Sequence, residues 1–548
     1  MRVLPLPSLA WQEAQCLSQS AAESAARAVP ARQQSAATRL AFRIIFIRIS
    51  GIDHARKIIE VNDPWQGQAV RRGRASPPRR AARRTRNTSG ASASLRCCDG
   101  QIYVAYATRT CPCRLGSLGT CSPYHEAHKR IRIALGNRSA LTETPRANTD
   151  QAMAGLSRRA TVADLAQEPF RIFFPTGVLA GITGVLLWPL HFWGFSSFYP
   201  GQGHARIMAS GFFGAFVFGF LGTALPRMLS AEPLGLRNVL LILSLHVSMV
   251  TAYAMQKILW GDRIFLALLT LFAVLMLNRA RKRQDTPPPG FVLVGLAFAC
   301  ALSGAALAVF QPGGEEGGAY WVLLQRLLSY QGFVLLPILG VGPFILPRFF
   351  GQKSSHDFPE MLAPSAEWRK KAARALVAGI VIVASFFLEV EGWHRSAYAV
   401  RFATALGYLA LEFPFSRRGT EAGNALATSL RIAFAALVGG FILIALVPAY
   451  RVSLLHLTLI GGFAVMTFTV ATRVVFGHSG NLPKLRERHG WLLIAVGLML
   501  LGMATRVSGD FWPKIMVSHY NYGAIAWIGG VLVWAWRVFP KLLQAEGE

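Results

Sequence analysis

The chain has 548 residues, of which 53% are hydrophobic and only 15% are charged. A soluble domain usually carries about 25% charged residues, so this composition excludes an ordinary soluble protein. The net charge of +30 is divided equally, because residues 1–152 hold 24 Lys and Arg against 9 Asp and Glu, and residues 153–548 hold 33 against 18. In the second part the basic residues lie mostly in loops between apolar runs, as in membrane proteins. We therefore expect a lipid bilayer, and no nucleic acid, as partner.

Residues 1–152 differ in character from the rest of the chain. Their middle reads AVRRGRASPPRRAARRTRNTSGASAS, which is rich in Arg, Ala and Ser and has no apolar run long enough to span a membrane. Low hydrophobicity with high charge favours disorder, so we expect a disordered basic extension. The composition changes close to Met153, which predicts that Met153 is the natural start and that residues 1–152 are a mis-assigned upstream extension. Residues 153–548 form the predicted membrane domain.

From residue 170 onward, apolar runs of about 20 residues recur, which is the length that crosses a hydrocarbon core of roughly 30 Å. The runs contain Gly and Pro and are not rich in strand-forming residues, so helices are expected rather than barrel strands. The sequence predicts an all-α integral membrane protein with about twelve transmembrane helices. The predicted spans are 170–193, 205–225, 237–257, 262–279, 291–311, 321–346, 372–391, 396–415, 428–448, 453–476, 489–509 and 518–538.

Loops rich in Lys and Arg alternate with loops poor in them along the whole membrane domain. Arg279, Arg281 and Lys282, for example, follow the fourth span, whereas acidic residues such as Glu389 and Asp510 lie in the loops expected on the other side. By the positive-inside rule, both termini are predicted to be cytoplasmic.

The predicted orientation places each histidine at a defined level across the membrane. His204 opens the second span at the outer side, His456 lies just inside the outer end of the tenth span, and His478 lies at the inner end of the tenth span. Imidazole is a common ligand of metals and haem iron, and a polar side chain within the bilayer is a functional candidate. The alternative for each histidine is a structural role in capping a helix or facing water.

Arginines accompany the outer histidines. Arg206, Arg326 and Arg401 are expected in the outer third of their spans. A guanidinium group binds a carboxylate through two hydrogen bonds, so these residues are candidates for binding haem propionates. The alternative is that the arginine extends to the interface, which we favour for Arg401.

The second, sixth and tenth spans share a layout. In each, a Gly-Phe pair precedes a basic residue by sixteen positions. The three sets are Gly211-Phe212 with Arg227, Gly332-Phe333 with Arg348, and Gly462-Phe463 with His478. This self-similarity predicts three repeats of four helices. The three equivalent helices are expected to pack at the centre through their glycines, with His204 and His456 near one another.

Three segments resemble the NnrS family. EPFRIFF resembles the family's R-P-F-F opening of the first span, and GHARIMASGFFGAFVFGFLGTALPR resembles its W-H-x-H-E-M-x-x-G…G-F-L-x-T-A-x-P segment. HLTLIGGFAVMTFTVATRVVFGHSG resembles its H-x-x-x-x-G-G…R-V-x-x-G-H-T-G segment, which is the most specific of the three. The resemblance covers about 170–540, the whole membrane part.

The resemblance implies a twelve-helix protein of the bacterial inner membrane that carries haem and copper and belongs to the response to nitric oxide and nitrosative stress. His204, His456 and His478 fall on histidines of the family, which makes all three candidate metal ligands. The second His and the Glu of H-x-H-E-M are replaced here by Arg206 and Ile207, which puts the copper site in doubt. We expect haem b near the outer face, bound by His456 and His204, with Arg206 or Arg326 at a propionate.

Two other functions fit parts of the sequence. Twelve spans, internal repeats and helices interrupted by proline are also typical of a secondary transporter, here of a small solute or metal complex. A haem–copper oxidase-like subunit is disfavoured, because no two histidines are adjacent in the sequence. The sequence contains no phosphate-binding loop, carboxylate dyad or nucleophile–base pair, so it leaves open whether the protein is an enzyme.

Overall fold

The structure is a computed structural model that describes residues 96–98, 101–103, 158–310, 318–413, 425–481, 484–485 and 489–545. The predictions of a disordered extension over residues 1–152 and of a start at Met153 lie outside these residues, except for one short antiparallel pair. This pair joins β1 (Arg96–Cys98) to β2 (Gln101–Tyr103) and belongs to a separate unit, Asp53–Pro145. All the long helices belong to the other unit.

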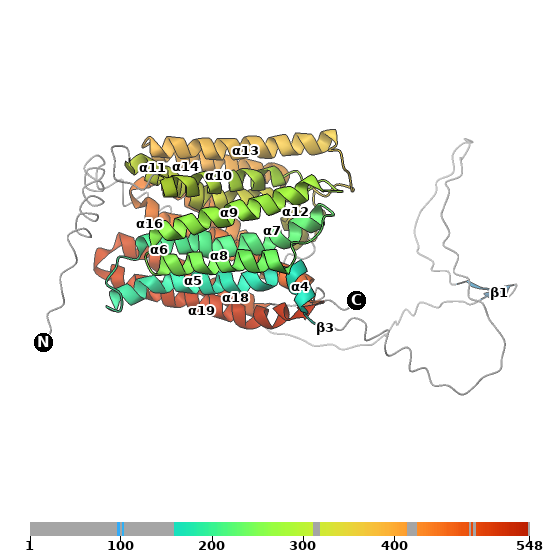
Figure 1. Ribbon diagram of the computed structural model, residues 1–548, viewed down its shortest axis with the longest axis horizontal. Helices are drawn as coiled ribbons and strands as arrows, with labels where there is room; N and C mark the ends of the chain where they lie inside the picture. The colour runs from blue at the N-terminus through green and yellow to red at the C-terminus, as the bar shows by residue number, and fades with distance from the viewer. Residues whose placement is uncertain are drawn as a thin grey trace, which may run out of the picture. The chain divides into compact units, whose positions relative to one another are not determined.

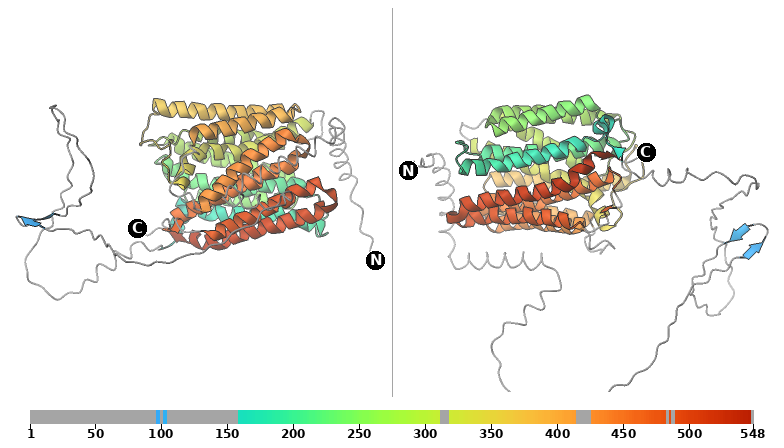
Figure 2. Two further views of the ribbon diagram at one scale, coloured as in Figure 1. Left: turned by 180° about the vertical axis from the view of Figure 1, so that it is seen from behind. Right: turned by 90° about the horizontal axis from the view of Figure 1, so that it is seen from below.

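The long helices run side by side in one bundle (Figures 1 and 2). Repeat 1 consists of α5 (Phe170–Phe192), α6 (Gly201–Arg206), η1 (Ile207–Phe213), α7 (Gly214–Met228), α8 (Leu236–Ala254) and α9 (Ile258–Arg281). Repeat 2 consists of α10 (Phe291–Phe310), α11 (Gly318–Arg326), η2 (Leu327–Gly332), α12 (Phe333–Ile345), η3 (Leu346–Phe350), α13 (Ala366–Val390) and α14 (His394–Glu412). Repeat 3 consists of α15 (Ala425–Leu446), η4 (Pro448–Tyr450), α16 (Arg451–His456), η5 (Leu457–Ala464), α17 (Val465–Gly477), α18 (Gly490–Phe511), η7 (Pro513–Ile515) and α19 (Met516–Leu542).

The prediction of an all-α integral membrane protein is confirmed. Eleven helices among the described residues are long and apolar enough to span a membrane. The span predicted over residues 396–415 corresponds to α14, which does not meet this criterion, because it is less apolar than the other long helices and carries Arg395, Arg401 and Glu412. This helix packs against α13 and α15.

Each repeat has the same plan. The first helix packs along the second, and the third and fourth helices form a packed pair, α8 with α9, α13 with α14, and α18 with α19. The second helix of every repeat contains a π-helical segment, η1, η2 or η5. The Gly-Phe pairs lie within or at the end of these segments, so the predicted threefold repeat agrees with the order and packing of the helices.

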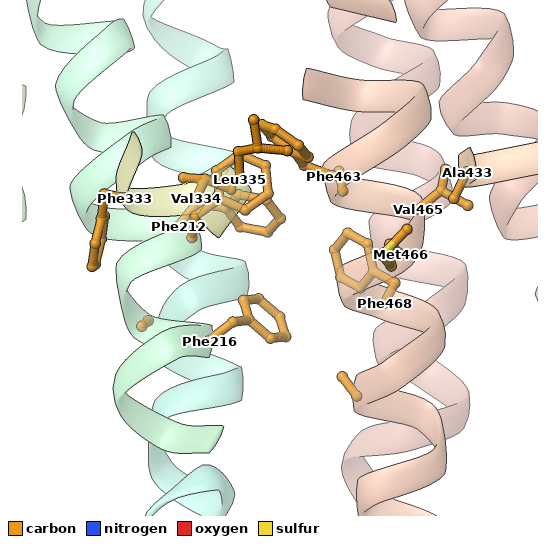
Figure 3. Packing of buried hydrophobic residues seen from close by; sticks show 14 of the residues in the cluster. Phe212, Phe216, Phe333, Val334, Leu335, Ala433, Phe463, Val465, Met466 and Phe468 are labelled. Carbon is orange, nitrogen blue, oxygen red and sulfur yellow. The ribbon is translucent and has the colours of Figure 1, made fainter. Parts of the chain in front are cut away.

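The second helices of the three repeats form the centre of the bundle. They are the most buried of the candidate spans, with 78%, 72% and 61% of their apolar windows inside the protein. Phe213 of η1 and Phe463 of η5 have ring centroids 6.1 Å apart, and Phe218 lies 6.5 Å from Phe333. Figure 3 shows the rings of Phe212 and Phe216 directed toward the helix that carries Phe463 and Phe468. Gly462 allows a different approach, between the first and second helices of repeat 3, since a Cβ on it would lie 3.1 Å from the backbone of Leu437 in α15.

The π-helical segments disturb the regular hydrogen bonding of the helix, which leaves carbonyl groups in need of other donors. His246 of α8, which is buried in the middle of the bundle, lies with Nε2 2.9 Å from the carbonyl oxygen of Gly211 in η1. This histidine therefore has a structural role in stabilising the central helix of repeat 1.

Candidate functional site

His204 and His456 lie together at one end of the bundle, as expected from the repeat. His204 is in the last turn of α6, three residues before η1, and His456 ends α16, directly before η5. His204 is close enough to His456 to influence its charge, and Arg506 of α18 is close enough to influence both. Two imidazoles from repeats 1 and 3 therefore share one polar environment.

The two imidazoles are held in the same way. Nδ1 of His204 lies 2.9 Å from the carbonyl oxygen of Gly184, and Nδ1 of His456 lies 2.9 Å from the carbonyl oxygen of Val452. A carbonyl oxygen only accepts, so this geometry assigns the proton to Nδ1 in both rings. The lone pair on each Nε2 is then free to bind a metal, which is the usual arrangement of a ligating histidine whose other nitrogen donates to a carbonyl.

Aromatic rings lie beside His204. The ring of Trp188 in α5 lies 6.0 Å from the ring of His204, 5.6 Å from Tyr199 and 5.7 Å from Tyr520. Tyr520 in turn lies beneath the guanidinium of Arg506, with 3.8 Å between the carbon of the guanidinium and the ring centroid. His204 thus has a flat apolar surface on one side, and both histidines have a cation nearby.

The two arginines predicted to meet a propionate differ in their surroundings. Arg206 forms two hydrogen bonds with Asp262, from Nε at 2.8 Å and Nη2 at 3.0 Å, so its guanidinium already binds a carboxylate of the protein. Arg326 is exposed and has no hydrogen bond or ion pair within the described part of the chain, although it is close enough to Tyr199 and Tyr330 to influence them. Of the two, Arg326 is the one whose guanidinium is available to an anionic group.

Arg206 belongs to a pattern that the sequence analysis missed. In each repeat the third and fourth helices are joined at this end by a tyrosine that donates to an acidic side chain nine or ten residues away, and an arginine pairs with the acid. The three clusters are Tyr253–Asp262–Arg206, Tyr398–Glu389–Arg401 and Tyr520–Asp510–Arg506. They fix the helix ends around the two histidines. The spacing of Tyr and acid across each hairpin was the available signal in the sequence.

The expectation that Arg401 extends to the interface is wrong. Its side chain is fully buried, with Nη1 2.5 Å from Glu389 Oε2 and Nε donating to Ser385 Oγ at 2.8 Å. Nη1 also donates to Oε1 of Gln331 in η2 at 3.1 Å. Glu389 was expected in a loop but lies buried in the last turn of α13, where Arg451 of α16 pairs with it at 3.2 Å. This network links repeats 2 and 3.

His478 lies at the opposite end of the bundle from the other two predicted ligands. About 22 residues of helix separate it from His456, which corresponds to roughly 33 Å. Its Nδ1 is 2.7 Å from Oε1 of Glu168, which also pairs with Arg171 at 2.6 Å and Arg227 at 2.5 Å. His478 therefore joins the end of α17 to the segment before α5. Among the described residues, no group of three or more His, Cys, Asp and Glu is placed to hold a metal ion.

The network around Glu168 predicts a dependence of stability on pH. Burial alone raises the pKa of Glu168, but the hydrogen bond and charge of His478, together with Arg171 and Arg227, lower this pKa from 4.5 to about 2. Because the pKa is lowered, the ionised carboxylate of Glu168 stabilises the folded state above pH 4.5, and this contribution is lost as the pH falls toward 2.

We therefore expect Glu168→Gln to lower the thermal unfolding midpoint of the purified protein at neutral pH and to have a much smaller effect in acid. Glu360→Gln, which changes an exposed carboxylate, is the matched control. An equal loss of stability in the Glu168 variant at neutral and acidic pH would contradict the ion-pair account.

The family described as NnrS protein matches this chain over residues 164–545, which includes every long helix and both His204 and His456. A search of curated proteins found no match. Because the match covers most of the chain, and the helices form a single bundle over the matched range, the chain belongs to the NnrS family.

Proposed function

We propose that this protein binds haem b through His204 and His456 and acts in the response to nitric oxide and nitrosative stress. The observation that carries the proposal is the placement of two imidazoles from different repeats in one polar environment, each with Nδ1 held by a carbonyl. A haem iron takes four nitrogens from the porphyrin and needs only one or two ligands from the protein. Two such histidines suit this requirement without a third ligand.

The residues around the pair suit the rest of the cofactor. The rings of Trp188, Tyr199 and Tyr520 offer apolar surface to a macrocycle, and Arg326 is a cation for a propionate. Copper is not part of the proposal, because His478 is at the other end of the bundle and Arg206 is engaged by Asp262.

In this proposal each part of the chain has a defined task. The haem would supply an iron that binds nitric oxide. The carbonyls of Gly184 and Val452 orient the two imidazoles, and the ring of Trp188 excludes water from one side of His204. The tyrosine–acid–arginine clusters keep the helix ends at a fixed spacing, so that both imidazoles stay aligned when the surrounding bilayer changes.

The protein is a multi-pass membrane protein, and we propose that it lies in a bacterial inner membrane with both termini in the cytoplasm. The loops rich in Lys and Arg support this orientation through the positive-inside rule. His204 and His456 would then face the periplasmic side, and the Glu168–His478 network would face the cytoplasm.

The test is the absorption spectrum of the purified protein, oxidised and then reduced. We expect a reduced band of the b type and a shift of the spectrum when nitric oxide is added. A protein that contains no haem after expression with sufficient haem, and that takes no haem up on reconstitution, would contradict the proposal. It would favour a secondary transporter, whose interrupted central helices the three π-helical segments also resemble.

A further inference from the structure

A pocket of about 490 Å³ lies between the ends of α17, α18 and α19, at the end of the bundle opposite the two histidines. Its lining combines basic side chains with aromatic ones. The residues are Lys484, His489, Arg537 and Lys541, with Phe476, Trp491, Trp536 and Pro540. No described residue of this lining is acidic, so the pocket concentrates positive charge in a concave surface, where it attracts anions most strongly.

Contacts within the wall hold several of these side chains in place. Nζ of Lys541 lies 5.1 Å from the centre of the Phe476 ring and 3.5 Å from Oδ1 of Asn481. The ring of His489 lies 5.5 Å from Phe476 and 5.6 Å from Trp491. Lys541 and His489 are thus positioned before any ligand arrives, which lowers the entropy cost of binding one.

The pocket lies at the level where the bilayer meets water. The candidate spans that form it begin at Gly490 and end at Leu542. Trp536 is 80% exposed, and tryptophan is enriched at this level of membrane proteins. One helical turn deeper, on the same helix faces as the lining residues, the exposed side chains are apolar: Ile494 lies three residues after Trp491, and Leu532 lies four residues before Trp536.

We propose that this pocket binds the headgroup of an anionic phospholipid, with the phosphate between Arg537, Lys541 and Lys484 and the acyl chains along α18 and α19. The basic side chains match the phosphate, and the aromatic and apolar surfaces match the part of the lipid that enters the bilayer. Basic pockets between spanning helices are a recurrent form of lipid headgroup site. A free phosphate ion would use the same cations but gain nothing from the apolar surface.

The test is native mass spectrometry of the full chain in detergent, presented with equal amounts of phosphatidylglycerol and phosphatidylcholine. We expect the protein to retain phosphatidylglycerol in preference. Arg537→Gln with Lys541→Gln should weaken this retention by roughly fivefold for each charge removed. Arg281→Gln with Lys282→Gln is the matched control, because these exposed residues end α9 and do not line the pocket, and it should leave retention unchanged.

Lys484→Gln provides an independent variant, since Lys484 is exposed and lies outside the spanning helices, and its loss is expected to leave folding intact while lowering retention about fivefold. Equal retention of the two lipids by the unaltered protein would overturn the proposal. So would an equal loss in the control variant, or binding of inorganic phosphate as tight as that of phosphatidylglycerol.

Discussion

Replacing Glu389 with glutamine is expected to destabilise the protein by about 3–5 kcal/mol, which is the usual cost of removing one partner from a buried ion pair. The side chain of Arg401 is fully buried and pairs with Glu389 at 2.5 Å, and Arg451 pairs with the same carboxylate at 3.2 Å. Without the carboxylate, the charge of Arg401 remains inside the bundle with only neutral partners, Ser385 and Gln331.

Equilibrium unfolding in mixed micelles with increasing dodecyl sulfate measures this effect. Glu391→Gln removes an exposed carboxylate two residues away and should change stability little. Exchange of Glu389 and Arg401 together for Gln and Met should recover part of the loss, because the uncompensated charge is then gone. If Glu389→Gln were as stable as Glu391→Gln, the buried pair would contribute nothing and its role in joining repeats 2 and 3 would be refuted.

Replacing His456 with alanine is expected to remove most of the haem b, and His204→Ala is expected to do the same. In either variant the iron loses an axial imidazole while the neighbouring carbonyl and aromatic groups stay in place. The result does not depend on loss of the fold, because Nδ1 of each histidine contacts a backbone carbonyl, which stays in place in the variant.

Rescue by added imidazole distinguishes a variant that has lost only the iron ligand from one that has lost its folded structure. Glycine at position 456 leaves space for a free imidazole, so His456→Gly is expected to regain part of the reduced band when imidazole is supplied. Failure of imidazole to restore any band in a well-folded variant would mean that His456 acts in some way other than as a ligand.

Much of the fold was predictable because its determinants are local. Spanning length and the alternation of basic loops depend on short stretches of sequence, and the repeat was visible in the Gly-Phe pairs. The nearness of His204 to His456 followed from placing equivalent helices at the centre. These predictions needed no knowledge of which side chains pair with one another.

The polar interior was not predictable in this way. Hydropathy treats each charged residue as unfavourable in a bilayer, so Arg401 was expected at the interface, although Ser385 and Gln331, 16 and 70 residues away in sequence, accept its hydrogen bonds. Arg206 was expected to be available because its partner, Asp262, is 56 residues away. The π-helical segments also lack a local signature, since the glycines that accompany them are common throughout the chain.

The reduced-minus-oxidised spectrum of three variants, His204→Ala, His456→Ala and His478→Ala, tests the central claim most directly. Each spectrum is normalised to the amount of folded protein. We predict that the first two variants lose or shift the b-type band and that His478→Ala retains it, because His478 pairs with Glu168 at the opposite end of the bundle. Full haem in His204→Ala and His456→Ala, with loss only in His478→Ala, would place the cofactor at the wrong end of the bundle and contradict this account.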